Sequence, residues 1–272
     1  MKRIIILAVA VLAAAVSCNN GPKTNAEKSA IFNEELDKIF TEYREAEEPD
    51  ADATIDKLVT LCLNTIKKYP NDSVALEALQ NCYYYADPED IQDALGRMNK
   101  DFMEDPFVQR VNEGLTAKLN TRVGQPFVDF TVEHVLGKAA DGSLITEQRS
   151  LSDYVGKGKY ILVDFWSPWC PPCKEELPNI KNVYEKYHGD KFDILSVAVW
   201  EESHNMDWHD TIDTAAVYGI TWNQINNGHR EPASLYGIDG IPHVILFGPD
   251  GTILKRDLRG EVLEAAVAEV AL

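Results

Sequence analysis

A buried-strand pattern that runs directly into two closely spaced cysteines constrains this chain more than any other feature. Residues 160–166 read Y-I-L-V-D-F-W, a run typical of a strand covered on both faces. Cys170 and Cys173 follow, separated by two prolines, and a helical pattern extends from Pro171 to about His188. Proline suits the first turn of a helix because its missing N–H group would be unpaired there. The sequence therefore predicts a strand, a cysteine pair at a helix N-terminus, and a helix.

The segments around this junction predict an α/β sheet over residues 121–272. Strands and helices alternate along the region, and a Pro-Asp-Gly turn joins two of the strands as a hairpin. This order predicts a layered sheet with one antiparallel edge. The expected strands are at 127–132, 160–166, 192–199, 241–247 and 252–255, with a turn at 137–142 and helices at 171–188, 207–218 and 261–271.

The preceding region, residues 29–120, has helical spacing throughout. Apolar residues recur every three or four positions, and Pro, Asp and Asn residues interrupt the pattern, so we expect an all-helical subdomain of four to six helices. Helices at 52–69 and 73–86 would form a hairpin that brings Cys82 within about one turn of facing Cys62. A structural disulfide and two free buried thiols both fit this placement.

The first residues predict export and a lipid anchor. Two basic residues precede an apolar stretch from Ile4 to Val16, which is too short to span a bilayer but is typical of a signal peptide over 1–17. The tract that ends at Cys18 resembles the lipobox of bacterial lipoproteins, which implies a lipidated Cys18 and a tether over 18–28. Ordinary cleavage that leaves a free thiol is the alternative. We expect a chain held on the bilayer by lipid, in the bacterial cell envelope and facing the periplasm.

Composition excludes several classes of function. The chain has 26 basic and 44 acidic residues, a formal net charge of −18, and no basic run for nucleic acid. A structural zinc site needs four ligands, and neither a second closely spaced cysteine pair nor a paired-histidine motif supplies them. We therefore expect no metal, no cofactor and no nucleic-acid partner.

The place of the cysteine pair predicts redox chemistry. Unpaired N–H groups and the helix dipole at a helix N-terminus stabilise an anion, so a lowered pKa would make Cys170 a reactive thiolate. Cys173, almost one turn further along, can attack the mixed disulfide that Cys170 forms. A structural disulfide across so small a loop would stabilise little, which favours exchange chemistry.

Longer motifs show a family resemblance. The stretch I-L-V-D-F-W-S-P-W-C-P-P-C-K over 161–174 resembles the active-site segment of thioredoxins, and Y-G-I-D-G-I-P over 236–242 resembles their cis-proline loop. The leader V-G-Q-P-F-V-D-F over 123–130 and the tract C-K-E-E-L-P over 173–178 are similar to the extracytoplasmic TlpA-like branch. The resemblance covers about 123–272. It implies a thioredoxin-like fold preceded by a helical extension.

The resemblance also implies roles for single residues. Asp164, buried in its strand, would have a raised pKa and exchange a proton with Cys173. Pro242, if cis, would expose the backbone of Ile241 to an extended substrate segment. Trp169 would belong to an apolar docking rim.

Other residues near the cysteine pair allow less specific predictions. We assign Trp166 to the core, Glu175 and Glu176 to the helix start, and Pro178 to the family's helix kink. His243 either tunes the thiolate or lines the strand.

These observations predict a lipid-anchored thiol-disulfide oxidoreductase that reduces protein disulfides outside the cytoplasm. Its partners would be disulfide-containing proteins and a membrane dithiol that donates electrons. A disulfide oxidase or isomerase is the alternative, because the intervening prolines do not fix the direction. A thiol peroxidase is disfavoured, since Val163 and Ser167 stand where peroxiredoxins carry Pro and Thr. A binding lipoprotein that acts through its helical region is the remaining alternative.

Overall fold

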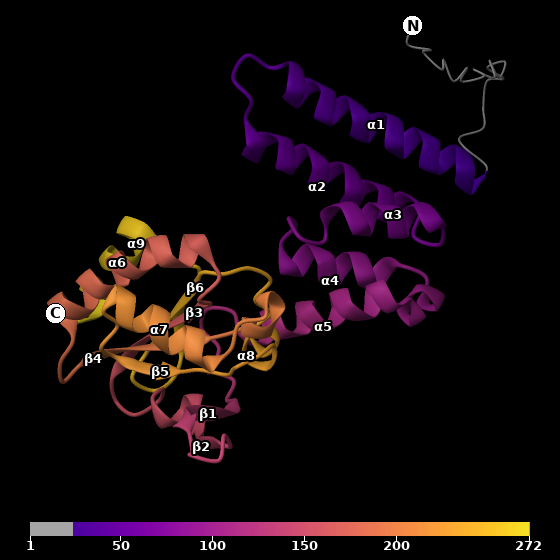
Figure 1. Cartoon of the computed structure of the whole chain (residues 1–272). Coiled ribbons are helices and arrows are strands. Elements are labelled where there is room, and N and C mark those ends of the chain that lie inside the picture. The colour runs from indigo at the N-terminus through magenta and orange to yellow at the C-terminus, as the bar shows by residue number, and fades with distance from the viewer. Residues whose placement is uncertain (1–23, 272) are drawn as a thin grey trace, which may run out of the picture. The chain divides into compact units, whose positions relative to one another are not determined.

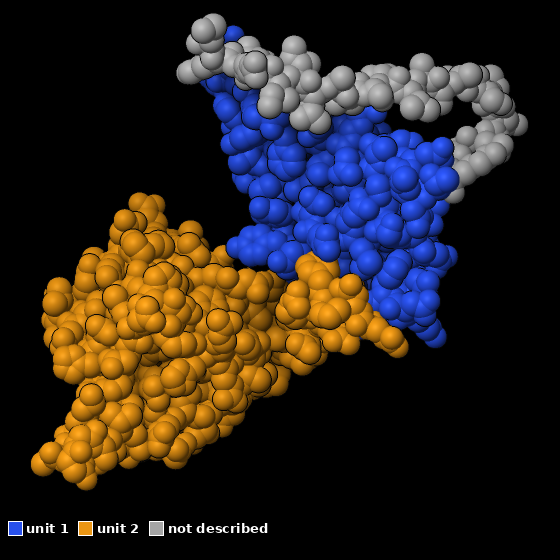
Figure 2. Space-filling view, turned by 45° about the vertical axis from the view of Figure 1, so that its right-hand side comes forward, with its two compact units in different colours: residues 1–103 blue, residues 104–272 orange. Residues whose placement is uncertain are grey.

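The computed structural model describes residues 24–271, and the chain divides into two compact units (Figure 1). Unit 1 extends to residue 103, and unit 2 begins at residue 104 (Figure 2). The described part of unit 1 is helical, whereas unit 2 combines helices with strands. None of the helices between 24 and 271 is long and apolar enough to cross a membrane.

Side-chain caps begin the first two helices of unit 1. A capping box begins the first helix, because Thr24 and Glu27 each accept the other's backbone N–H. Asp50 begins the second helix by accepting the N–H of Ala53 at 3.0 Å. The helical N-terminal region expected from the sequence is confirmed. The helices are α1 (Asn25–Glu45), α2 (Ala51–Lys68), α3 (Ser73–Cys82) and α4 (Pro88–Arg97), followed by the 3₁₀ helix η1 (Lys100–Glu104).

The hairpin of α2 and α3 carries two cysteines. Cys62 and Cys82 are both fully buried, and their side chains are within hydrogen-bonding contact, as the reflection about the turn at Pro70 predicts. The structure leaves both as free thiols rather than a disulfide. Their contact and their burial raise the pKa of Cys62 above its usual range, so this thiol is protonated at neutral pH.

Helix α5 (Pro106–Asn120) belongs to unit 2. Lys118 near its end forms an ion pair with Asp239 at 2.6 Å, and the hydroxyl of Thr121 donates to the carbonyl of Tyr236 at 3.2 Å. These contacts tie α5 to the loop after α8 (Glu231–Leu235). The sequence predicts a domain boundary at 120/121, where the helical pattern ends. The two compact units instead divide at 103/104, because α5 packs with unit 2.

The central sheet of unit 2 has the strand order β5-β4-β3-β6-β7. Strand β3 runs parallel to β4 and antiparallel to β6, so the predicted mixed sheet with an antiparallel edge is confirmed. The short strand β5 was not expected from the sequence. The bounds are β3 (Tyr160–Trp166), β4 (Phe192–Ala198), β5 (Asn223–Ile225), β6 (His243–Phe247) and β7 (Ile253–Lys255).

A separate hairpin precedes this sheet. Strands β1 (Thr131–Lys138) and β2 (Leu144–Ser150) pair antiparallel, so the strand expected at 127–132 and the turn expected at 137–142 were both placed too early. The cause is a tertiary contact. The Tyr236 hydroxyl accepts the N–H of Val128 and donates to its carbonyl, which occupies the backbone that would otherwise pair with a strand.

Helices cover the sheet unequally. Helices α6 (Pro171–Tyr187) and α9 (Gly260–Ala271) pack together on one face (Figure 1), where Leu162 of β3 joins their apolar cluster. The side chains of Val163 and Phe165 point to the other face, toward β1, η2 (Leu151–Asp153) and α8. Because side chains alternate along a strand, Asp164 lies on the face that α6 covers.

Candidate active site

The cysteine pair lies where β3 turns into α6. Cys170 is the N-cap of α6, and its sulfur accepts the backbone N–H of Cys173 at 3.2 Å. The two cysteines form a disulfide, with their Cα atoms 5.3 Å apart. Pro171 and Pro172 occupy the first helical positions, as the sequence predicts. The junction therefore holds Cys170 where backbone donors and the helix dipole stabilise a thiolate.

A second loop approaches the same sulfur. Cys170 Sγ lies 3.7 Å from the carbonyl oxygen of Ile241, and the Ile241–Pro242 peptide bond is cis. Arg259 anchors this loop by donating to the Pro242 carbonyl at 2.8 Å. Residues Cys170 and Cys173 are only 2% and 1% exposed, whereas Pro171 is exposed. The disulfide is thus reached over the helix start and the Ile241 loop.

Trp169 is fixed by a third segment. Its indole N–H donates to the carbonyl of Trp200 at 2.8 Å, and its ring stacks on His204, with centroids 4.0 Å apart and planes 21° apart. Trp200 has φ +59°, a left-handed conformation uncommon for a bulky residue, and it begins the short helix η3 (Glu201–His204). Trp169 is therefore half-buried against a turn. Trp166, assigned to the core, is fully buried.

Asp164 is a buried carboxyl group on β3, the strand that leads into the junction. It is 1% exposed, and burial, reinforced by the charge of Glu176, raises its pKa to about 7. The hydroxyl of Ser196 donates to Oδ2 at 3.3 Å and opposes this rise. Asp164 Oδ1 has no hydrogen-bond partner among the described residues. The group can hold or release a proton near neutral pH.

His243 follows the cis-proline and is held within a cationic cluster. Its Nε2 lies 3.3 Å from Nη2 of Arg256. The guanidinium group of Arg256 also donates to two backbone carbonyls, from Nη1 to that of Thr121 and from Nη2 to that of Tyr236. Burial, followed by the charge of Arg256, lowers the pKa of His243 to about 4. His243 is therefore neutral at pH 7, and it lies at the first residue of β6.

Comparison with known proteins agrees with this geometry. Residues 123–256 match the model of the AhpC/TSA family. Unit 2 carries a thioredoxin-like domain of this family. The domain is similar to the thiol-disulfide oxidoreductases ResA of Geobacillus thermodenitrificans, with 27% identity over 52% of this chain and 71% of that protein, and of Bacillus subtilis, with 26% identity over 53% and 72%. The chain is an oxidoreductase of the thiol-disulfide kind.

Solved structures resemble the same part of the chain. The thioredoxin domain of a thiol-disulfide oxidoreductase from Bacteroides vulgatus aligns with a TM-score of 0.43 and 27% identity, over 56% of this chain and 99% of that one. The C-terminal domain of a putative thiol-disulfide oxidoreductase from Bacteroides thetaiotaomicron aligns with a TM-score of 0.45 and 25% identity, over 56% and 97%.

Glu176 of the thioredoxin-like domain differs from its expected role as a helix-start residue. It lies beyond the first turn of α6, is only 8% exposed, and accepts the N–H of Gly260 at 2.9 Å. Its carboxylate thus sits at the first residue of α9 and also acts on Asp164. Helical spacing offered one signal for this, because Glu176 follows Cys173 by three residues and so lies on the same face of the helix.

Two further expectations stand apart from the thioredoxin-like domain. Cys18, the expected lipidation site, and the signal peptide over 1–17 lie outside the described residues. Within residues 24–271, no group of three His, Cys, Asp or Glu side chains is placed to hold a metal ion.

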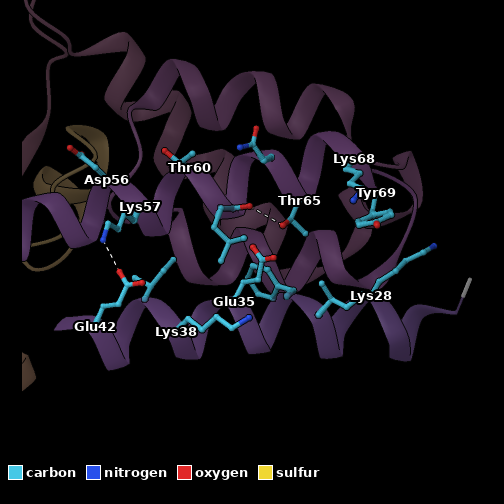
Figure 3. Close-up of a pocket in the computed structure, with 15 residues that line it drawn as sticks. Lys28, Glu35, Lys38, Glu42, Asp56, Lys57, Thr60, Thr65, Lys68 and Tyr69 are labelled. Atoms are coloured by element: carbon cyan, nitrogen blue, oxygen red, sulfur yellow. Dashed lines mark hydrogen bonds and ion pairs between the residues drawn. The ribbon is translucent and has the colours of Figure 1, made fainter. Parts of the chain in front are cut away.

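A groove between α1 and α2 is a cavity of about 760 Å³ in unit 1 (Figure 3). Its rim carries charges of both signs, and Lys57 spans the two helices by pairing with Glu42 at 2.7 Å. The residues that line it include no cysteine. This cavity belongs to unit 1, whereas the Cys170–Cys173 disulfide belongs to unit 2.

Proposed function

We propose that this chain reduces disulfide bonds of proteins outside the cytoplasm through Cys170 and Cys173. The observation that carries the proposal is the Cys170 sulfur at the N-cap of α6, where it accepts a backbone N–H. A thiolate at this position keeps its negative charge without a neighbouring cation, and so it is a nucleophile near neutral pH.

The exchange has two steps. The Cys170 thiolate attacks one sulfur of a substrate disulfide, forms a mixed disulfide, and releases the other substrate sulfur as a thiolate. Cys173 then loses its proton and attacks Cys170, which closes the Cys170–Cys173 disulfide and releases the second substrate sulfur. Two electrons pass to the substrate. A dithiol of another protein returns them to the pair.

Asp164 serves as the proton acceptor for Cys173 in the second step. It lies on the face of the sheet that α6 covers, and its raised pKa matches the task of taking a proton at neutral pH. Burial supports this role, because a carboxylate without water around it gains more from accepting a proton.

The substrate docks beside Ile241, Pro242 and Trp169. The Ile241 carbonyl already points to the Cys170 sulfur, so an extended segment paired with this backbone would bring its own sulfur into line. Trp169 offers apolar contact from the other side of the junction. The buried sulfurs explain why the substrate must fit these walls closely.

Location follows from the N-terminal sequence. The signal-peptide pattern over 1–17 and the lipobox-like tract at Cys18 support export and attachment to the bilayer by lipid. The electron donor would then be a dithiol protein of the membrane, and the substrates would be disulfide-containing proteins on the periplasmic side.

The reduction potential of the pair tests the direction of the reaction. We would titrate the full chain, with Cys18, Cys62 and Cys82 replaced, against a dithiol buffer and follow the Cys170–Cys173 disulfide. We expect a value near or below about −230 mV, typical of thioredoxin-like reductants. A value above about −150 mV would overturn the reductase and favour an oxidase or isomerase.

A peroxide assay distinguishes a disulfide reductase from a thiol peroxidase. We expect the reduced chain to transfer electrons to a protein disulfide faster than to hydrogen peroxide at equal concentration. Faster turnover of peroxide would instead support the thiol peroxidase that the substitutions at Val163 and Ser167 disfavour.

A further inference from the structure

Three buried side chains of unit 2, those of Trp222, Ser196 and Asp164, form a hydrogen-bond chain of fixed direction. The indole N–H of Trp222 donates to Ser196 Oγ at 2.9 Å, and Ser196 lies 3.3 Å from Asp164 Oδ2. An indole N–H can only donate, so the Ser196 oxygen must accept. The one hydroxyl proton of Ser196 is then free to point at Asp164. A carboxylate is the better acceptor for this proton.

The fold leaves little freedom to change this arrangement. Ser196 and Asp164 are register partners on the parallel strands β4 and β3, and both are essentially inaccessible to solvent. Trp222 is 5% exposed and contacts Ser196 from the segment between α7 (Trp208–Tyr218) and β5. The centroid of its ring lies 5.2 Å from that of Tyr184 on α6. Ser196 and Asp164 are 0% and 1% exposed, so bulk solvent does not contact either residue in the folded chain.

We propose that Trp222 and Ser196 act as a relay that favours the ionised form of Asp164, which makes Ser196 a positioning residue for thiol exchange. The inference rests on the proposed function of Asp164 as proton acceptor. Ser196 touches neither cysteine in this scheme and acts only through Asp164.

The groups around Asp164 explain why such a relay is needed. Glu176 on α6 is the charged group that acts on it, and this negative charge disfavours ionisation. Strand β6 contributes apolar Val244 at the register position on the other side. Burial acts in the same direction as Glu176, so the hydroxyl of Ser196 is the contact that opposes both. Asp164 Oδ1, which has no partner among the described residues, is left as the place where a proton binds.

The direct test is the titration of Asp164 itself. We would label aspartate carboxyl carbons with ¹³C in the full chain and follow Asp164 by NMR, assigned through its loss in Asp164→Asn. We expect Ser196→Ala to raise the pKa of Asp164 by about one unit, and Trp222→Phe, which keeps an aromatic ring but no donor, to raise it by about half as much. Ser196→Thr, which restores a hydroxyl, should return it toward the starting value.

A packing control accompanies these variants. Ile194→Val shortens a buried side chain on the same strand and in the same apolar cluster as Trp222. We expect it to leave the pKa of Asp164 unchanged. An equal shift in Ile194→Val, or no shift in Ser196→Ala, would overturn the relay.

The pH profile of exchange separates this proposal from the one on which it rests. We expect the midpoint of the rate of mixed-disulfide resolution to move to higher pH in Ser196→Ala, by the same amount as the NMR titration. If the titration moves and the rate profile does not, the relay stands and the role of Asp164 as proton acceptor fails. If the rate profile moves while the titration does not, the relay is overturned.

Discussion

Two cysteine pairs in this chain, one in each unit, show how placement decides the chemistry of a thiol. Cys170 and Cys173 are buried at a helix N-terminus and form a disulfide, whereas Cys62 and Cys82 are buried in the middle and at the end of two packed helices and remain thiols. Both pairs are nearly inaccessible. Burial alone therefore does not distinguish them.

The difference lies in the backbone around each sulfur. Cys170 precedes the first helical residue, so it receives an N–H group that has no partner within the helix. Cys62 lies inside α2, where such N–H groups already serve the helix, and its contact with Cys82 raises its pKa. One site stabilises a thiolate, and the other stabilises a thiol.

Replacing one cysteine from each pair gives the largest contrast. We expect Cys170→Ser to lower the rate of disulfide exchange by about 1,000-fold or more, because the serine hydroxyl does not ionise near neutral pH. Cys62→Ser should retain nearly the full rate. Both rates would be measured with the same disulfide-containing protein, and a comparable loss of rate in the two variants would contradict the difference between the two cysteine pairs.

The raised pKa of Asp164 should make the free energy of unfolding fall as pH rises. Its folded pKa of about 7 lies above the usual value of 3.8, so the folded state binds the proton more tightly and loses stability as pH rises between these values. Asp164→Asn removes this loss. We expect the free energy of unfolding of the variant, relative to the parent, to increase by on the order of 3 kcal/mol between pH 5 and pH 8.

Denaturant unfolding at the two pH values would measure this difference. A matched control is Asp193→Asn, a half-buried aspartate on β4. An equal pH dependence in the control would show that the effect does not come from the buried carboxyl group.

The cysteines of unit 1 should contribute to packing rather than to catalysis. We expect Cys62→Ala to cost about 1 kcal/mol of stability, since a fully buried sulfur is lost, with no change in exchange rate. Alkylation of the unfolded, oxidised chain should label both Cys62 and Cys82. Labelling of neither would instead support the structural disulfide that their spacing also allows.

The smallest expected effect concerns the surface beside the reactive pair. His204→Ala removes the ring that stacks on Trp169, and we expect KM for a protein substrate to rise by about 2–5-fold with little change in kcat. His209→Ala, at an exposed histidine on α7, is the matched control. A fall in kcat alone would assign His204 to the chemistry rather than to the docking surface.

Local patterns were sufficient for the strand, the cysteine pair and the helix that follows it. Three local features carried this prediction: the apolar run over 160–166, the two prolines and the spacing of the cysteines. Each acts within one turn or one strand, so it can be recognised in the sequence without knowledge of the tertiary structure. The start of β1 was misplaced, because the Tyr236 hydroxyl binds the backbone of Val128 across more than 100 residues. The short strand β5 was missed, since three residues carry too little pattern.

The candidate site divides in the same way. Local sequence was enough to place a dithiol at a helix N-terminus after a buried strand, because helix capping and strand burial depend on neighbouring residues. Tertiary packing brought Ser196 to Asp164, Trp222 to Ser196, Arg259 to the Pro242 carbonyl, and Glu176 to the start of α9. Each of these contacts joins residues that are well separated in the sequence. Their geometry is set by packing of the sheet and its helices, which no local pattern encodes.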